Sequence, residues 1–263
     1  MIEEDWKGFA TAFDRAVRPS GDAGRSSRRI LVIGCAMTIA AAIAALINGV
    51  LGGPAVATPD EVEARTEATT APTGGGVGAG GEWTAVAGPS CASEGGGSFT
   101  AYGYYTGTNS DQTTGWTSQA RGGYSGGSCT GGYLSMPVSG DKTSYDDSRF
   151  ALWKFDFSRS LTSASCRLDT YVPKDSRRDR VGGDPAYYYY YQSDFAYGSN
   201  DQPLDGYRVA QVSEQGHWVR SPAFKVRTGR VTVKLVNAGA KDTAATRDAH
   251  VAVAQVKITC HAV

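Results

Sequence analysis

Hydrophobic and polar residues alternate in short runs over the last two thirds of the chain. The segment VTVKLV at residues 231–236 alternates in this way, and so does CRLDTYV at 166–172. Because successive side chains of a strand point to opposite faces, each run separates its residues into two faces. The pattern therefore predicts strands that each bury one face in a core.

Nine segments are the clearest strand candidates. They are residues 98–105, 133–138, 150–157, 166–172, 186–191, 207–212, 217–226, 231–236 and 251–260. Gly, Asp and Asn are frequent between these segments, as in tight turns, and no helical periodicity competes with the strand pattern there. Residues 83–263 are therefore expected to form one all-β domain, an antiparallel, jelly-roll-like β-sandwich.

Near the N-terminus lies a long hydrophobic run without strand character. Residues 30–51 include no charged side chain, and a helix of about 20 residues crosses a bilayer. Arg28 and Arg29 end the polar segment 1–29 directly before this run, and basic residues stay on the cytoplasmic side. We therefore expect a cytoplasmic tail at 1–29, one transmembrane helix at 30–51 that acts as a signal-anchor, and an extracellular remainder.

Cleavage of this segment is the alternative. Ala55-Val56-Ala57 matches the A-x-A cleavage site of a secretory signal, so the protein would be secreted after cleavage following Ala57. Hydrophobic regions of secretory signals span about 7–15 residues, which favours the uncleaved anchor. Residues 52–82 hold much Gly, Ala, Thr and Pro and few bulky apolar side chains, so they are expected to form a disordered linker.

The charge balance narrows the range of partners. The chain has 26 Lys and Arg residues and 26 Asp and Glu residues, so its formal net charge at pH 7 is zero. This balance gives no electrostatic preference for nucleic acid. All tyrosines and all tryptophans except Trp6 lie beyond residue 80, which concentrates the aromatic side chains in the predicted β domain.

Four of the five cysteines fall in the predicted extracellular domain. Cys35 lies inside the apolar run, which leaves Cys91, Cys129, Cys166 and Cys260. An even number of cysteines in an oxidising compartment predicts disulfides, and three pairings exist. We prefer Cys91 with Cys129 and Cys166 with Cys260, because the second pair would join two long neighbouring strands. No pair has the C-x-x-C spacing of many zinc sites.

Several spaced motifs between residues 164 and 260 carry a family resemblance. They are CRLDTYVP at 166–173, DPAYYYYY at 184–191, VAQVSEQGHWVRSPAFKV at 209–226 and Asp248-Ala249. This part resembles the golvesin C-terminal-like domain, a β-sandwich module also found on xanthan-lyase-type bacterial enzymes and described as carbohydrate-binding-like. The chain departs from the family at Ser221-Pro222-Ala223 and in a long loop at 192–205. The resemblance implies the fold, and it brings no catalytic residues.

Candidate chemistry along the chain is sparse. Gly123-Tyr124-Ser125-Gly126-Gly127 matches a G-x-S-x-G elbow, but the first histidine is His217 and a strand-turn-helix context is missing, so a turn is expected. The spacing of the carboxylates suggests no glycosidase pair. We therefore predict no catalytic residue and no cofactor. A structural Ca²⁺ site using Asp146, Asp147 or Asp201 is the one metal candidate.

The run Tyr187–Tyr191 is the most unusual local feature. In a strand, Tyr187, Tyr189 and Tyr191 share one face and Tyr188 and Tyr190 the other, so one set is expected to be partly exposed. Tyr187 falls on the Ala-Tyr pair of the resembled family, which implies that its set packs inward. Tyr188 and Tyr190 are therefore the predicted ligand-binding residues, as rings that stack on sugars. A core role for these rings is the competing interpretation.

These observations favour a membrane-tethered extracellular binding module. Its expected partner is cell-wall or another polysaccharide, in adhesion or in the cell envelope. The alternative is an extracellular protein-interaction or signalling domain with a structural role, which would bind an envelope protein. An exported hydrolase ranks third, because no catalytic constellation is found. Trp218 is expected to lie in the core.

Overall fold

The computed structural model describes residues 77–78, 81–93, 95–108, 114–193, 195 and 201–263. The predicted cytoplasmic tail, transmembrane helix and most of the linker, with Cys35, lie outside these residues. The described residues form strands β1 to β16 and no helix, so the all-β prediction is confirmed for them. None of their elements is a helix long and apolar enough to span a membrane.

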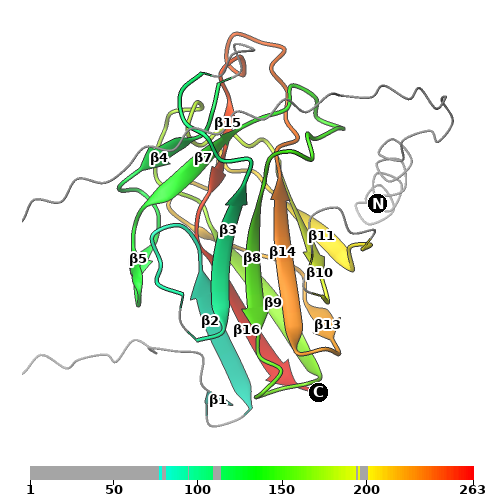
Figure 1. The fold of residues 1–263 in the computed structure, drawn as a ribbon. Helices are drawn as coiled ribbons and strands as arrows, with labels where there is room; N and C mark the ends of the chain where they lie inside the picture. The colour runs from blue at the N-terminus through cyan, green and yellow to red at the C-terminus, as the bar shows by residue number, and fades with distance from the viewer. Residues whose placement is uncertain (1–76, 79–80, 94, 109–113, 194, 196–200) are drawn as a thin grey trace, which may run out of the picture. The chain divides into compact units, whose positions relative to one another are not determined.

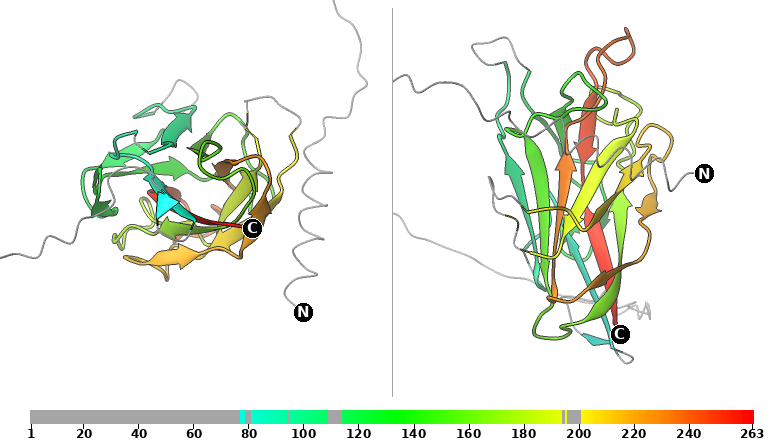
Figure 2. Two further views of the ribbon diagram at one scale, coloured as in Figure 1. Left: turned by 90° about the horizontal axis from the view of Figure 1, so that it is seen from below. Right: turned by 90° about the vertical axis from the view of Figure 1, so that its right-hand side faces the viewer.

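Two antiparallel sheets make up most of the fold (Figure 1). The six-stranded sheet contains β1 (Val77–Gly78), β2 (Glu82–Ala87), β16 (Val256–Ala262) and β9 (Ala164–Tyr171), with β12 (Trp218–Arg220) and β13 (Phe224–Val226) both paired to β9. The five-stranded sheet has the order β11 (Asp205–Val209), β10 (Ala186–Tyr191), β14 (Arg230–Val236), β8 (Phe150–Asp156) and β3 (Gly97–Tyr102). Figure 2 shows these sheets from two further directions as separate layers.

Two smaller sheets complete the described fold. One has the order β15 (His250–Val253), β7 (Tyr133–Pro137) and β4 (Thr117–Gln119), and the other pairs β5 (Ser125–Gly126) with β6 (Cys129–Thr130). The chain passes from β15 to β16 through Ala254 and Gln255, and so connects the three-stranded sheet to the six-stranded sheet.

The main core contains the inward-facing residues of both large sheets. Val231, Val233 and Leu235 of β14 belong to it, as do Cys166 and Leu168 of β9. These residues are at most 1% exposed, so the alternation of the sequence correctly predicted that they share the face turned toward the core. Such dense apolar burial is the main source of the domain's stability.

The strand predictions were most accurate for the longer, uninterrupted strands. β10 spans the predicted residues, and β7, β8 and β14 differ from the prediction by one residue at one end. The short strands β4, β5 and β6 were missed, and so was β2. β1 and the first residue of β2 lie within 52–82, so ordered structure begins inside the segment expected to be a linker.

The single long strand predicted at 217–226 is two strands, β12 and β13. Arg220 faces Asp169 and Phe224 faces Cys166, so three residues of this edge oppose two residues of β9. The extra residue is a bulge, and it contains Pro222, which has no N–H to donate. The hydroxyl of Ser221 fills the gap, because its Oγ accepts a hydrogen bond of 3.0 Å from the backbone N–H of Leu168.

The strand predicted at 251–260 is also divided, at Ala254 and Gln255. The buried Gln255 side chain bonds to backbone groups of three other segments. Its Nε2 donates to the carbonyl oxygens of Pro89 at 2.7 Å and Gly132 at 2.8 Å, and its Oε1 accepts from the N–H of Tyr124 at 2.8 Å. These contacts hold the small sheets against the end of the six-stranded sheet.

Both predicted disulfides are present. Cys91 is bonded to Cys129, and Cys166 is bonded to Cys260. Cys166 and Cys260 face each other on β9 and β16, so this bridge crosses the middle of the six-stranded sheet. The first bridge joins the segment after β2 to β6.

Candidate functional site

The tyrosine strand β10 does not expose the predicted ligand-binding residues. Tyr188 is fully buried and Tyr190 is 1% exposed, so the prediction that they form the solvent face is wrong. Tyr188 stacks on Tyr207 with 5.2 Å between ring centroids, and Tyr190 stacks on Phe224 at 4.2 Å. Their positions follow from the register with β14, where each faces an inward-pointing apolar residue.

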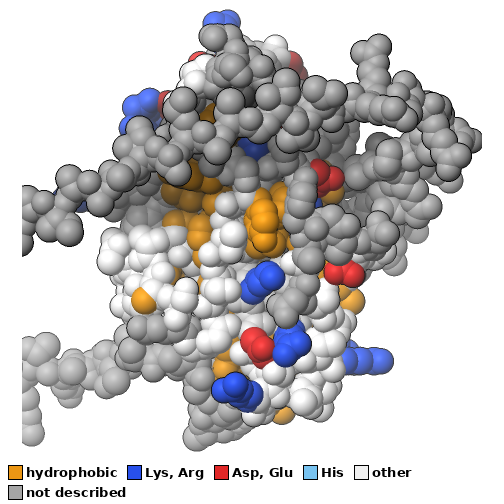
Figure 3. All heavy atoms as spheres, in the orientation of Figure 1, with side chains coloured by type: hydrophobic (Ala, Val, Ile, Leu, Met, Phe, Trp, Pro, Cys, Tyr) orange, Lys and Arg blue, Asp and Glu red, His pale blue; other side chains and the backbone are white. Residues whose placement is uncertain are grey.

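The opposite face of β10 is buried as well. Tyr187, Tyr189 and Tyr191 belong to a second hydrophobic cluster on the outer side of the five-stranded sheet, together with Phe150, Leu152, Phe195, Val236 and Ala238. The expectation that one tyrosine set would be partly exposed is therefore also wrong, and burial raises the pKa of all five hydroxyls. Hydrophobic side chains gather on this side over the upper ends of β3, β8 and β14 (Figure 3).

Tyr190 still forms part of one concave surface. A cleft of about 430 Å³ lies beside the ends of β10 and β13, and its lining residues are Tyr190, Gln192, Leu204, Asp205, Ala223, Phe224, Lys225 and Arg227. The Tyr190 hydroxyl donates a hydrogen bond to the Asp205 carboxylate, which adds to the effect of burial in raising its pKa. Because its ring is stacked on Phe224, Tyr190 contributes little surface to this cleft.

The outer side of the six-stranded sheet carries a more open aromatic group, here called the aromatic patch: Tyr124, Tyr171 and Trp218. All three side chains are only half-buried, so Trp218 is not the core residue that was expected. The ring centroids are 4.9 Å apart for Tyr124 and Trp218, 5.2 Å for Tyr171 and Trp218, and 6.0 Å for the two tyrosines. Three separate segments thus place their rings side by side.

Sheet register creates much of this arrangement. Trp218 on β12 lies directly opposite Tyr171 on β9. The loop before β5 brings Tyr124 to them, because the Tyr124 N–H is bonded to Gln255. The outward direction of Tyr171 followed from the alternation at 166–172. Its pairing with Trp218 required knowledge of which strands are neighbours, and no sequence signal supplied that.

A row of charged side chains borders the patch. Lys257, Asp169 and Arg220 face one another on the adjacent strands β16, β9 and β12. Arg220 Nε lies 2.7 Å from Asp169 Oδ1, and Lys257 Nζ lies 3.4 Å from Asp169 Oδ2 and 4.9 Å from the Trp218 ring centroid. The Asp169 side chain is 5% exposed and that of Arg220 is 61% exposed. The surface beside the rings therefore presents cations and hides the carboxylate.

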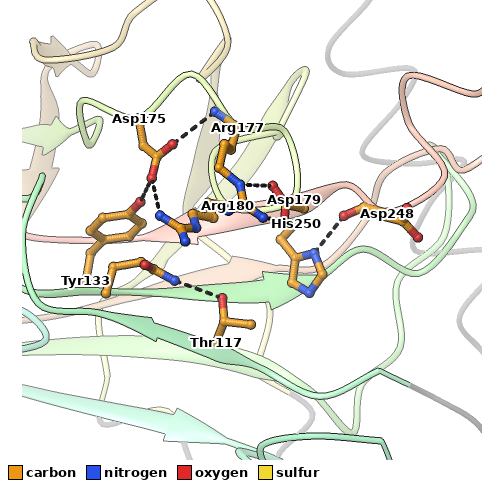
Figure 4. Close-up of polar contacts among 9 residues, drawn as sticks. Thr117, Tyr133, Asp175, Arg177, Asp179, Arg180, Asp248 and His250 are labelled. Carbon is orange, nitrogen blue, oxygen red and sulfur yellow. Dashed lines mark hydrogen bonds and ion pairs between the residues drawn. The ribbon is translucent and has the colours of Figure 1, made fainter.

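A polar network holds the neighbouring loop after β9 in place (Figure 4). Asp175 Oδ2 accepts hydrogen bonds from the Tyr133 hydroxyl at 2.9 Å and from Arg180 at 3.1 Å. Partial burial raises the pKa of Asp175, but its hydrogen bonds from Arg177, Arg180 and Tyr133 outweigh this effect and lower it. Burial and the bond to Asp175 raise the pKa of Tyr133.

The same loop contacts both sides of the aromatic patch. The Lys174 N–H donates to the Gly122 carbonyl at 2.8 Å, two residues before Tyr124. The Val172 carbonyl accepts from the Gly216 N–H at 2.8 Å, two residues before Trp218. The Asp175 network therefore supports the backbone on which two of the three rings stand.

The predicted calcium ligands do not converge. Asp146 bonds to Arg149 and to the Ser148 N–H, Asp147 bonds to Lys234, and Asp201 accepts from the Ser193 hydroxyl. Within the part of the chain that the structure describes, no three or more His, Cys, Asp or Glu side chains are grouped as metal ligands. Ser125 lies on strand β5, which pairs with β6, and the turn between them is at 127–128, so the turn predicted around Ser125 is only partly correct.

Comparisons with known proteins show no family for this chain. No family model and no curated protein matches it. One similar solved structure is the K3 cleaved adhesin domain of Lys-gingipain (Kgp) from Porphyromonas gingivalis w83, with a TM-score of 0.29 and 8% sequence identity. The likeness covers 63% of this chain and 99% of that chain. At this level it supports no inference about function.

Proposed function

We propose that this chain is a membrane-tethered, extracellular binding module that contacts cell-wall or another polysaccharide through the aromatic patch. One observation carries the proposal: Tyr124, Tyr171 and Trp218 stand half-exposed on the outer side of a sheet, within 4.9–6.0 Å of one another. Aromatic rings with one wet side combine apolar contact with hydrogen bonding, which suits the C–H faces and hydroxyl groups of sugars.

The surroundings of the patch suit the same ligand class. Arg220 and Lys257 place hydrogen-bond donors beside the rings, and Asp169 holds both donors in position. Binding surfaces gain affinity when their groups are positioned before the ligand arrives. Here the sheet register and the Asp175 network supply that positioning.

The extracellular location rests on two features. The disulfides Cys91–Cys129 and Cys166–Cys260 are typical of oxidising compartments. The uncharged segment 30–51, preceded by Arg28 and Arg29, is the membrane anchor in this proposal. The resemblance of residues 164–260 to a carbohydrate-binding-like module agrees with the proposed partner.

Binding of the full chain to an array of cell-wall and other polysaccharides tests the proposal. Trp218→Ala removes the central ring and should weaken binding by about tenfold or more, because a loss of about 1.4 kcal/mol has that effect. Tyr104→Ala is the matched control, since Tyr104 is 46% exposed and lies outside the patch. It should bind like the unchanged chain.

Two results would count against the proposal. The first is unchanged polysaccharide binding by Trp218→Ala. The second is a chain that binds no polysaccharide on the array but captures one envelope protein in a manner that Trp218→Ala abolishes. This second result would establish the alternative, an extracellular protein-interaction domain that uses the same surface.

A further inference from the structure

A buried lysine lies on the outer side of the five-stranded sheet. Lys234 is on β14, opposite Tyr189 of β10 and Leu152 of β8, and its side chain is 5% exposed. Three rings surround its ammonium group. Nζ lies 4.5 Å from the ring centroid of Phe150, 5.0 Å from that of Tyr145 and 5.1 Å from that of Phe195. We call these three rings and Lys234 the lysine cage.

Asp147 enters the cage from the loop between β7 and β8. Its Oδ1 lies 3.1 Å from Lys234 Nζ, and half of its side chain remains exposed. The backbone around Asp147 is fixed on both sides. The Asp146 N–H donates to Asn237 Oδ1 at 2.8 Å, and the Ser148 N–H donates to Asp146 Oδ1 at 2.9 Å. The amine and the carboxyl group are therefore held together by the fold.

The environment of Lys234 favours reactivity. Loss of hydration disfavours the ammonium form, whereas Asp147 favours it; burial has the larger effect and lowers the pKa of Lys234. A desolvated lysine is a stronger nucleophile because more of it is a neutral amine. Groups held at near-contact distance react as if at very high concentration, with effective molarities of about 10⁵–10⁸ M.

We propose that Lys234 and Asp147 form an intramolecular amide bond. A proton first passes from Nζ to Oδ1 along their hydrogen bond, which gives an amine and a carboxylic acid. Nζ then attacks Cγ, the Nζ–Cγ bond forms, and one Cγ–O bond breaks. The departing hydroxyl leaves as water with a second proton from Nζ. The reaction needs no oxidant or cofactor, and the exposed half of Asp147 gives the water a route to solvent.

A second lysine–aspartate pair serves as an internal comparison. Lys257 Nζ lies 3.4 Å from Asp169 Oδ2, but the Lys257 side chain is 31% exposed. Asp169 also contacts Arg220, whose Nε lies 2.7 Å from its Oδ1, so this carboxylate is shared between two cations. This pair remains an ion pair. The amide at Lys234 would join β14 to the loop before β8 and would persist after the disulfides are reduced.

Mass spectrometry of the full chain, after reduction of the disulfides, tests the inference. The unchanged chain should weigh one water molecule less than its sequence, and peptide fragmentation should place a branched linkage between Lys234 and Asp147. Lys234→Met and Asp147→Ala should each lose the linkage and the mass deficit. Lys257→Met is the matched control and should retain both.

Two results would overturn the inference. One is a mass that equals the sequence mass, which would leave Lys234 and Asp147 as an ion pair. The other is a water loss that fragmentation places elsewhere, for example as a cyclic imide at Asp205-Gly206. Neither result depends on polysaccharide binding, so the two proposals are tested separately.

Discussion

The outer sides of the two large sheets use similar residues to opposite effect. Across the six-stranded sheet, Lys257, Asp169 and Arg220 form a row beside half-exposed rings. Across the five-stranded sheet, Lys234 lies between Tyr189 and Leu152 in a row that is buried. Each side has a lysine above an aromatic ring and an aspartate beside that lysine.

The difference lies in what covers the strands. On the five-stranded sheet, Phe195 and Tyr145 come from connecting segments and pack over the tyrosine face of β10. On the six-stranded sheet, the rings of Trp218 and Tyr171 contact each other and Tyr124, which comes from a connecting segment, and all three keep part of their surface in water. Connections between strands, rather than the strands themselves, therefore decide which aromatic face is open to a ligand.

Removal of a ring from the covered side should have the largest effect on stability. Phe150 is 1% exposed, stacks on Tyr102 with centroids 4.6 Å apart and forms part of the lysine cage. Phe150→Ala should reduce the free energy of unfolding by about 3–5 kcal/mol, measured by chemical denaturation. Leu204→Ala is the control, since Leu204 is 43% exposed, and a loss within about 0.5 kcal/mol is expected. Equal losses in both variants would mean that this side is not a second core.

An intermediate effect is expected from the network that supports the open side. The pKa of Asp175 is lower in the folded chain than its usual value of 3.8. The ionised carboxylate therefore stabilises the fold at pH values above 3.8, and this contribution is lost as the pH falls through the lowered pKa. Asp175→Asn should reduce the free energy of unfolding at pH 7 by about 1–2 kcal/mol. The difference between the two proteins should shrink below pH 4, as followed by denaturation at several pH values.

The binding measurement extends this second prediction. Because the loop that contains Asp175 contacts the segments before Tyr124 and Trp218, polysaccharide binding by Asp175→Asn should weaken while the Tyr104→Ala control is unaffected. An Asp175→Asn variant with unchanged binding and unchanged stability would show that sheet register and the bond from Tyr124 to Gln255 position the aromatic patch without the Asp175 network.

The fold was largely predictable because its strands obey a local rule. Period two placed Val231, Val233 and Leu235 in the core before any neighbour was known. The bulge at Ser221-Pro222 and the break at Gln255 were missed, because each depends on a partner far along the chain, Leu168 in one case and Pro89 and Gly132 in the other. The cysteine pairing was also correct: an even number of thiols left three arrangements, and the preferred one joins two long strands that are indeed neighbours.

The candidate site was harder to predict, because it too depends on partners that lie far apart along the chain. Alternation divided Tyr187–Tyr191 into two sets correctly, but the choice of the inward set depended on register with β14. The burial of the outward set depended on Phe195 and Tyr145, which a strand pattern does not include. Tyr124, Tyr171 and Trp218 come together only when β12 pairs with β9 and Gln255 bonds to Tyr124. Local patterns thus identify faces, and long-range pairing identifies sites.

At the centre of the aromatic patch, the expected loss of stability is no larger than that of Asp175→Asn. Trp218 is half-buried, and its packing comes from two tyrosine rings and the Lys257 ammonium. Exposed contacts between a cation and a ring contribute about 0.5–1 kcal/mol, so Trp218→Ala should reduce the free energy of unfolding by only about 1–2 kcal/mol. Denaturation of this variant beside Phe150→Ala makes the comparison direct. A small loss of stability together with a large loss of binding is the behaviour of a ligand surface. A loss as large as that of Phe150→Ala would instead make Trp218 a structural residue and remove the distinction between the open and covered sides.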